Sequence, residues 1–520
     1  MRNCGIWMVS SLLLVLPLFA AEKAKPNLII ILADDLGYSD PSCYGGEIPT
    51  PSLDKLAAEG MRLTRFHNCG MCVVSRASML TGKWWPRAQK DFTAMDILPE
   101  HLKSAGYRTG LIGKWHLAGH PMDHGFDHFF GFLDGFADHF AGGPSYRLDR
   151  AKFNEFGSEF YSSDALTDRA LQFINRDKAP FFLYLAYQAP HNPLQAPRED
   201  IMKFRGRYLK GWQRVREERF RRQKEIGIVA KDAVLPAFPA NLPAWDSLTP
   251  QQKDLEDLRM AVYAAMVERM DKGIGRLMDA VRAMDSSRET IVLFMSDNGA
   301  DSFSVVDAEM LKQGKLPGDR ASNWQPGTGW AYASVTPWRL YKISQHGGGI
   351  TTGAIVWRSG GDASNKGVIH DTGIHMVDLL PTFMNLVGEP VSTDGESFAA
   401  LLRGDDWKRE KPLYFQYLDN RAIRTSTQTL VEVDGNGWEL FNTSTDPLET
   451  NNLAAADTAA VRVLEKQWLD WWKDQGMNKG YQPEPSRGSQ HYRPQGDKGS
   501  GDLYQPSAMP DALSDRYPLR

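Results

Sequence analysis

Residues 26–37, PNLIIILADDLG, decide the fold of this chain. The apolar run at 26–32 is typical of a strand buried on both faces of a parallel sheet. Asp34 and Asp35 follow it directly, at the carboxyl end where open α/β sheets collect their ligands. Paired carboxylates at this place suit a hard divalent cation. Two solvated loop aspartates are the alternative interpretation.

The same alternation of apolar runs and helical patterns continues along the chain. It predicts a large, mostly parallel α/β sheet with helices on both faces, spanning residues 22–404. Residues 320–338, rich in Gly, Pro, Trp and Ser, are expected to form a long functional loop. Strands are expected at 61–67, 107–112, 180–187, 290–295 and 352–357, and helices at 50–60, 100–105, 163–175, 250–284 and 374–386.

A different pattern begins after about residue 404. Short strands at hairpin spacing are expected at 413–417, 422–426, 429–433 and 438–441, followed by a helix at 459–474. Residues 405–476 therefore predict a smaller C-terminal unit, an antiparallel sheet with one helix. The remaining residues, 477–520, have the composition of a tail that is either disordered or wraps as an extended arm.

Composition excludes some classes of partner. The chain has 520 residues, 42% hydrophobic and 24% charged, with a net charge of −4, so no general attraction to nucleic acid or anionic membranes is expected. The charge-dense run at 198–230 is interpreted as a solvated helix. Residues 1–21 have a positive start, an apolar core and small residues for cleavage, which predicts a signal peptide and export to the periplasm or beyond. No membrane span is expected.

The cysteines leave an odd number in the mature chain. Cys4 would leave with the signal peptide, so Cys43, Cys69 and Cys72 remain. An odd cysteine in an oxidising compartment suggests a free, reactive thiol. If that thiol is Cys72, Cys43 and Cys69 could pair.

Cys72 stands just before a helical pattern in the segment HNCGMCVVSRASMLTG, residues 67–82. Unpaired N–H groups and the helix dipole favour an anion at such a helix start, and Arg76, one turn on, would point back to it. The segment therefore indicates a nucleophile beside an oxyanion site. A buried apolar cysteine is the alternative.

Polar residues also end the other expected strands. Lys114 and His116, in GKWHL, are two residues apart and would face the same side of an extended backbone. His191 follows the strand at 180–187, and Asp297 and Asn298 follow the strand at 290–295.

Residues 72–82 resemble the signature of type I sulfatases, C-x-P-S-R-x-x-x-L-T-G, whose cysteine is oxidised to formylglycine after synthesis. Val74 stands where that family usually has proline or alanine. In the segment YKISQHGGG, Lys342 matches the family's lysine, although Gly347 replaces the usual glutamate of an E-G-G run. The matching residues follow the family's order over residues 26–350, and the run at 198–230 resembles an insertion of the arylsulfatase branch. The residues that match the family are Cys72, Ser75, Arg76, Leu80, Thr81, Gly82, Asp34, Asp35, Lys114, His116, His191, Asp297, Asn298 and Lys342.

The resemblance implies an alkaline-phosphatase-like fold and hydrolysis of sulfate esters. It implies that one Ca²⁺ is held by Asp34, Asp35, Asp297 and Asn298, and that Cys72 carries the nucleophile as hydrated formylglycine. Arg76, Lys114 and Lys342 would neutralise the sulfate, His191 with Lys342 would serve the leaving oxygen, and His116 would take a proton from the diol. It also implies two partners: a sulfated small molecule or oligosaccharide, and a formylglycine-generating maturation enzyme.

Two alternatives stay open. One is a phosphomonoesterase or phosphodiesterase of the same superfamily, which would need further Asp or His ligands for a second metal. The other is a non-catalytic binder of sulfated glycans, if Val74 prevents maturation. Substrates are expected to be sulfated carbohydrates or aryl sulfates, with carbohydrates favoured. Candidate pocket-wall residues, for most of which plain packing is the favoured interpretation, are Trp84, Trp85, His139, Arg320, Trp324 and Trp330.

Overall fold

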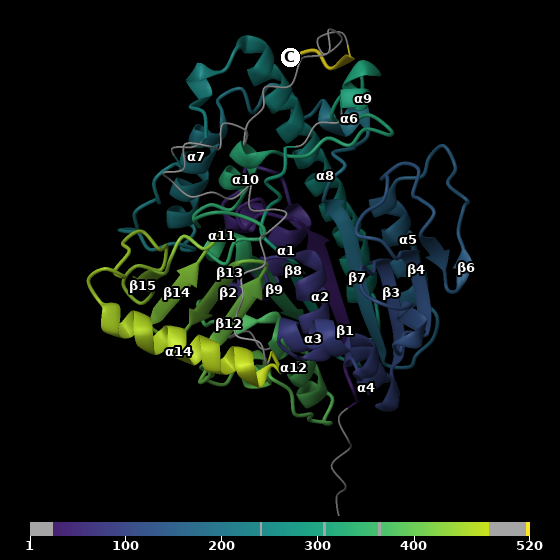
Figure 1. The fold of residues 1–520 in the computed structure, drawn as a ribbon. Coiled ribbons are helices and arrows are strands. Elements are labelled where there is room, and N and C mark those ends of the chain that lie inside the picture. The colour runs from purple at the N-terminus through teal and green to yellow at the C-terminus, as the bar shows by residue number, and fades with distance from the viewer. Residues whose placement is uncertain are drawn as a thin grey trace, which may run out of the picture.

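A computed structural model describes residues 24–239, 242–285, 287–304, 308–361, 366–477 and 516–519. Its main feature is a large mixed sheet with β1 (Asn27–Asp34) near the centre, between β7 (Phe181–Pro190) and β8 (Thr290–Ser296), both parallel to it (Figure 1). The strand order is β10-β2-β9-β8-β1-β7-β3-β4-β5-β6, and β11 also pairs with β2. The other strands are β2 (Met61–His67), β3 (Arg108–Lys114), β4 (His128–Phe132), β5 (Tyr146–Leu148), β6 (Ala151–Lys152), β9 (Thr351–Arg358), β10 (Val368–His370) and β11 (Ile374–His375).

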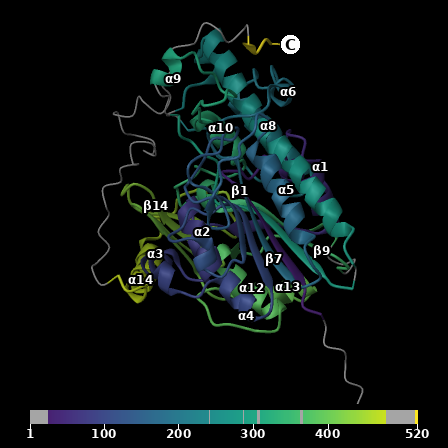
Figure 2. The ribbon, with the colours of Figure 1, turned by 90° about the vertical axis from the view of Figure 1, so that its right-hand side faces the viewer.

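Helices cover both faces of this sheet, as the sequence predicts. Figure 2 shows α5 and α8 on one side of the sheet and α2 and α4 on the other. The helices of the sheet region are α1 (Pro51–Glu59), α2 (Cys72–Thr81), α3 (Trp85–Asp91), α4 (Leu98–Ser104), α5 (Ser162–Ile174), α6 (Arg198–Ile201), α7 (Trp212–Glu225), α8 (Pro250–Arg282), α9 (Ala308–Lys312), α10 (Thr328–Ser334), α11 (Gly347–Ile350), α12 (Leu379–Leu386) and α13 (Ala399–Arg403).

The side chains of β1 explain why its sequence is a continuous apolar run. Ile29 and Ile31 belong to the core that includes α1, α5 and α8. Leu28, Ile30 and Leu32 belong to the core on the opposite face, with α2, α4 and α12. Successive residues of a strand point to opposite faces, so every side chain of a strand covered on both sides lies in an apolar core.

A small antiparallel sheet forms the C-terminal unit. Its strands run in the order β12 (Leu413–Tyr417), β13 (Asn420–Arg424), β14 (Gln428–Glu432) and β15 (Glu439–Asn442), and α14 (Thr458–Asp474) packs on them through Leu464, Trp468 and Trp471 (Figure 1). This confirms the expected sheet-plus-helix unit. The exact division at residues 404 and 405 stays a prediction.

Several element assignments need correction. The segment 374–386 is not one helix, because Ile374–His375 extends the sheet as β11 before a short 3-10 turn and α12. The expected loop at 320–338 contains α10. Helix α5 begins at Ser162, one residue before the expected start, and ends at Ile174.

Helix α7 is only half solvated, so the interpretation of the charged run as a solvated helix is wrong for its inner face. On its exposed face, Arg214 and Arg221 make i,i+4 ion pairs with Glu218 and Glu225. Arg216 and Arg219, however, are buried: Arg219 pairs with Asp40 at 2.6 Å. The charge density of the run did not reveal these buried arginines, since Asp40, the partner of Arg219, lies far away in the chain.

The two ends of the chain fall largely outside the described residues. The expected signal peptide at 1–21 and Cys4 lie outside them, as does most of the tail. Arg516 and Tyr517, near the C-terminus, contact the main body at Asp319 and Arg205. No helix in the described ranges is long and apolar enough to cross a membrane.

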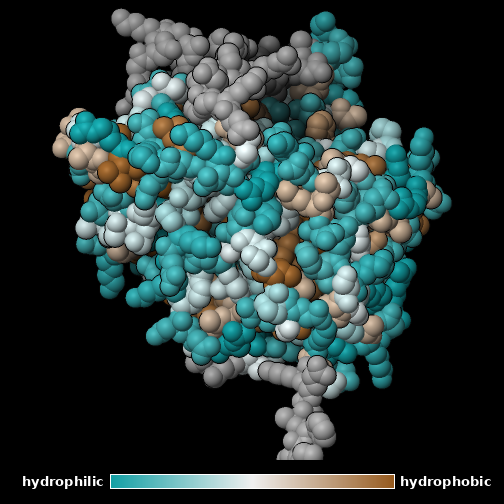
Figure 3. All heavy atoms as spheres, turned by 60° about the horizontal axis from the view of Figure 1, so that its bottom comes forward, coloured by the Kyte–Doolittle hydropathy of each residue, from teal (hydrophilic) through white to brown (hydrophobic). Residues whose placement is uncertain are grey.

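Cysteines and surface polarity complete the description. Cys43, Cys69 and Cys72 are all free in the structure, so the suggested Cys43–Cys69 pair is not formed. The face of the molecule in Figure 3 is mainly hydrophilic, with its apolar residues in small separate groups. Scattered apolar residues of this kind are ordinary on protein surfaces.

Candidate active site

The carboxyl ends of β1 and β8 bring four oxygen-bearing side chains together. β1 ends at Asp34 and is followed by Asp35, while Asp297 and Asn298 follow β8. The two strands are parallel, with Ala33 opposite Ser296, so both pairs lie at the same edge of the sheet. All four side chains are buried. The structure thus assembles the set predicted as metal ligands.

Three cations face these carboxylates. Lys114 Nζ lies 2.5 Å from Asp34 Oδ2, and Lys342 Nζ lies 2.7 Å from Asp35 Oδ1. Arg76 donates through Nη2 and Nε to Oδ2 of the third carboxylate, that of residue 297, at 2.8 and 3.0 Å. Three carboxylates therefore meet three cations, and the cluster is close to neutral before any ligand binds.

Backbone contacts place Lys342, which comes from a segment distant in sequence. Its N–H donates to Ala300 O at 3.2 Å, and the next N–H, of Ile343, donates to Gly70 O at 2.7 Å. These bonds tie the lysine both to the loop after β8 and to the loop before α2. The turn behind it needs glycine, because a Cβ on Gly348 would lie 1.9 Å from a backbone oxygen.

Cys72 is the first residue of α2, as the sequence predicts. Ser75 Oγ accepts a bond of 2.9 Å from Cys69 N, and Gly82 ends the helix in the left-handed region at φ 60°, which gives these signature residues a structural role. Burial raises the pKa of the Cys72 thiol even though Lys114 lowers it, so the thiol stays protonated near neutral pH.

His116 lies beside this cysteine, with Nδ1 3.3 Å from Cys72 Sγ. The predicted proximity of Lys114 and His116 to one site is confirmed, but the reason given for it is wrong. The backbone is not extended at His116, whose φ is 53°, and its N–H donates to Leu133 O at 3.1 Å. Burial, followed by the charge of Lys114, lowers the pKa of His116 to about 2.

His191 reaches the cluster from the end of β7. Its Nε2 lies 3.5 Å from Asp35 Oδ2, and its Nδ1 lies 2.7 Å from Asn192 O. Burial lowers its pKa to about 3, although Asp35 opposes the shift. His139, a candidate pocket-wall residue, instead supports this loop: its Nε2 lies 3.1 Å from His191 O and its Nδ1 lies 2.8 Å from Ser162 Oγ.

The donor set fits a divalent cation. Asp34 Oδ1 and Asn298 Oδ1 are buried and have no hydrogen-bond partner among the described residues. Asp34, Asp35 and His191 each offer a ligand atom, and these atoms lie within 4.8 Å of one another. Burial, and then the charge of Asp34, raises the pKa of Asp297 to about 6 despite Arg76. Such buried oxygens are stabilised by a metal ion.

The pocket-wall candidates confirm the packing interpretation in most cases. Trp324 and Trp330 are fully buried in the core, and Trp84 packs against Tyr414 and Trp471 of the C-terminal unit. Trp85 is half-buried against the core that includes α2. Arg320 donates to Ser158 O and lies over the Phe140 ring.

Sequence reasoning missed two buried residues of the site. Tyr184, inside β7, accepts a bond of 3.2 Å from Arg76 Nη1. Asp301 has a buried Oδ2 without a partner in the described part of the chain, and burial raises its pKa to about 7 although Lys342 lowers it. The position of Asp301, three residues after Asn298, was a usable signal; the tyrosine inside an apolar strand gave none.

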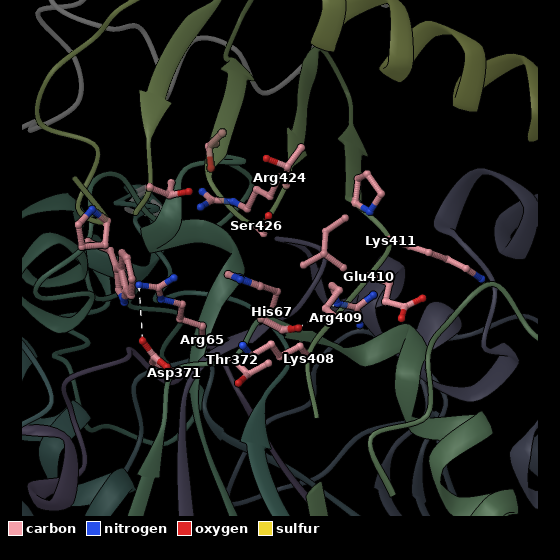
Figure 4. Close-up of a pocket in the computed structure, with 18 residues that line it drawn as sticks. Arg65, His67, Asp371, Thr372, Lys408, Arg409, Glu410, Lys411, Arg424 and Ser426 are labelled. Atoms are coloured by element: carbon pink, nitrogen blue, oxygen red, sulfur yellow. Dashed lines mark hydrogen bonds and ion pairs between the residues drawn. The ribbon is translucent and has the colours of Figure 1, made fainter. Parts of the chain in front are cut away.

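A cavity of about 340 Å³ lies elsewhere, between residues of β2 and the C-terminal sheet (Figure 4). It is rich in cationic residues, of which the three arginines have acidic partners. Arg65 lies 4.0 Å from Asp371, and Arg409 and Arg424 pair with buried carboxylates. Cys72 does not line it. The chemistry predicted from the sequence therefore lies at the strand ends and not in this cavity.

Comparison with known proteins agrees with this geometry. The family model described as Sulfatase matches residues 26–389. The chain belongs to the sulfatase family. An uncharacterized sulfatase of Schizosaccharomyces pombe is 33% identical over 88% of this chain and 95% of its own length. An arylsulfatase of Klebsiella aerogenes is 33% identical over 71% of this chain and 88% of its own length.

A solved structure in complex with its substrate, D-glucosamine-2-N,6-O-disulfate, shares the fold of this sulfatase. Its TM-score is 0.61 at 22% identity, covering 88% of this chain and 100% of that chain. The sulfatase is therefore a sulfuric ester hydrolase, and the family match favours this prediction over the phosphoesterase alternative. Sulfatases generally use a formylglycine and a metal ion.

Proposed function

We propose that this sulfatase hydrolyses sulfate esters of carbohydrates, with Cys72 converted to formylglycine and with Ca²⁺ as the metal. The observation that carries the proposal is the position of Cys72. It lies at the start of α2, its Sγ is 3.3 Å from His116 Nδ1, and it adjoins the cluster of cations and unpartnered oxygens. Its buried thiol holds its proton, so an unmodified Cys72 would be a poor nucleophile.

The metal would be held by Asp34, Asp35, Asp297 and Asn298. These are oxygen ligands, which Ca²⁺ prefers, and three of them are charged. Formylglycine, once formed from Cys72, would supply the nucleophilic hydroxyl of its hydrated aldehyde. Bound Ca²⁺ would supply positive charge that favours ionisation of that hydroxyl and binding of sulfate.

Electrostatics support binding of a sulfate ester at this place. The four carboxyl groups, that of Asp301 included, outnumber the cations Arg76, Lys114 and Lys342 by one, so a divalent cation makes the cluster positive overall even when all four are ionised. A sulfate ester is a monoanion, which such a buried positive cluster attracts strongly. The fixed lysines need little reorganisation to receive the charge on the sulfate oxygens.

The two histidines would take part in different proton transfers. His116, neutral because of its lowered pKa, has Nδ1 close enough to residue 72 to take a proton there. His191, next to Asp35, would hold a proton at the leaving oxygen together with Lys342. Binding of an anion would raise the pKa of both imidazoles, which favours the protonated form that His191 needs as a proton donor and makes neutral His116 a stronger proton acceptor.

Carbohydrate esters are our preferred substrate class. One relative is an arylsulfatase, and one structural neighbour is bound to a sulfated glucosamine substrate. Export through residues 1–21 would bring the enzyme to extracellular or periplasmic sulfated glycans. The proposal also needs a formylglycine-generating enzyme that accepts Val74 inside the signature.

Turnover tests the function directly. We expect protein co-expressed with a formylglycine-generating enzyme to release sulfate from a sulfated monosaccharide and from 4-nitrophenyl sulfate in the presence of Ca²⁺. Cys72→Ala should abolish release, whereas Cys43→Ala, at a free cysteine outside the cluster, should not. Equal activity of Cys72→Ala and wild type would overturn the proposal, as would cleavage of phosphate esters only. Binding of sulfated sugars with no turnover by matured protein would leave the binder alternative.

A further inference from the structure

Phe136 is out of place for a large apolar side chain. It is 51% exposed and lies in the loop between β4 and β5. Its ring stacks on His191, with the ring centroids 6.2 Å apart and the planes 18° from parallel. An exposed aromatic residue therefore stands directly beside the histidine assigned to the leaving oxygen.

Contacts of the residues on both sides of Phe136 hold its loop in place. The N–H and C=O of Ala137 bond to the side chain of Gln188 at 3.2 and 2.6 Å. On the other side Gly135 packs on His116, since a Cβ there would lie 3.0 Å from His116 Nε2. The ring therefore projects from a segment that is held by these contacts and that packs against both candidate catalytic histidines.

The position of the ring matches the part of a sulfate ester that the cation cluster does not recognise. Arg76, Lys114 and Lys342 provide charge for the sulfate, but they offer no surface for the alcohol. An aromatic face binds flat apolar surfaces, such as an aryl ring or the C–H face of a pyranose. Because the ring is already ordered, such a contact would lose little conformational entropy on binding.

We propose that Phe136 forms one wall of the leaving-group subsite and stacks on the ring of the alcohol, which makes it a specificity-determining residue for ring-bearing sulfate esters. This inference rests on the sulfatase chemistry proposed at Cys72. Packing on His191 without contact to substrate is the alternative role, and the two roles differ in what they do to KM and to the binding of free sulfate.

The test compares Phe136→Ala and Phe136→Trp with wild type on 4-nitrophenyl sulfate and N-acetylglucosamine 6-sulfate. We expect KM to rise about three- to tenfold in Phe136→Ala, in line with the usual strength of a ring stack, with kcat changed much less. Phe136→Trp should restore KM. The inhibition constant of inorganic sulfate, which has no ring, should stay the same in all three proteins.

Two results would overturn this inference while leaving the proposed function intact. One is an unchanged KM in Phe136→Ala. The other is an equal rise in the KM of ring-bearing substrates and in the inhibition constant of free sulfate, together with a fall in kcat. The second result would mean that the ring acts only through His191. A wild-type enzyme inactive on every sulfate ester, despite conversion of Cys72, would overturn both proposals. Thermal unfolding of the variants checks that this exposed substitution leaves the fold intact.

Discussion

Unpartnered oxygens are the clearest feature of the site at the scale of single residues. Asp34 Oδ1 and Asn298 Oδ1 are buried without a partner among the described residues, while the other carboxylate oxygens of Asp34, Asp35 and Asp297 face a lysine, an arginine or an N–H group. Leaving such atoms unsatisfied costs roughly 1–3 kcal/mol each. A bound cation would satisfy both atoms, so metal binding should stabilise the fold as well as support activity.

Added Ca²⁺ should therefore raise the melting temperature. At 100 times Kd the linkage relation gives about 2.7 kcal/mol of stabilisation for ligand bound to the native state alone. Thermal unfolding with Ca²⁺ or with chelator measures this difference. Asp297→Asn should remove most of the Ca²⁺-dependent shift, whereas Asp123→Asn, an exposed carboxylate, should keep it. The same shift in Asp297→Asn and wild type would contradict the metal assignment.

Site residues differ in how far the sequence could predict them. Cys72 was predictable from its place at a helix start, and Lys342 only from its resemblance to the family's lysine; both segments also need glycine or serine at fixed places. The turn at His116 was not, since its positive φ depends on pairing with Leu133. Phe136 was not singled out, because nothing local distinguishes an exposed phenylalanine from a core one.

At the scale of elements, a buried ion pair joins the two units of the protein. His346, which caps α11, lies with Nδ1 2.7 Å from Glu449 Oε2, after β15. Arg424 of β13 binds the other oxygen of the same carboxylate. Burial would lower the pKa of His346, but Glu449 outweighs it and raises the pKa. For Glu449, burial is outweighed by Arg424, which holds the pKa well below its usual range.

His346→Gln should destabilise the protein in a pH-dependent manner. The raised pKa means that the histidine contribution is complete below its unfolded pKa of about 6.5 and is lost as pH rises through the folded value. The carboxylate contribution is present above its unfolded value of about 4.3 and is lost as pH falls. We expect a loss of roughly 3 kcal/mol near pH 6, the low end for breaking a buried pair, and less near pH 9.

Urea unfolding at both pH values measures this effect, with His101→Gln on α4 as the control. A loss that is equal at pH 6 and pH 9 would contradict the charged pair. The sequence predicted the strand that precedes Glu449, but neither α11 nor the contact, because the partners are about a hundred residues apart and nothing in either segment points to the other.

At the scale of the whole molecule, the last described residues return to the main body. Tyr517 is 5% exposed, and its carbonyl accepts bonds of 3.1 and 2.9 Å from Arg205. Composition left the tail as either disordered or an extended arm, and only the position of these residues shows that the end of the chain packs. Alternating segments, by contrast, were enough to predict the layered sheet, because each buried strand shows an apolar run.

Tyr517→Ala should lower stability by up to about 3 kcal/mol, the low end for removing a buried aromatic ring. Leu519→Ala is the matched control, since Leu519 is two residues away and 48% exposed. Chemical unfolding compares them. Equal, negligible losses in both variants would mean that the C-terminal contact does not support the fold.

Conversion of Cys72 to formylglycine can be measured by mass spectrometry of the tryptic peptide Phe66–Arg76. The protein is purified after co-expression with a formylglycine-generating enzyme and assayed for sulfate release in the same preparation. We expect a peptide lighter by the difference between a thiol and an aldehyde, in a fraction that rises with the measured turnover. A preparation that hydrolyses sulfate esters while its peptide retains the intact thiol would contradict it.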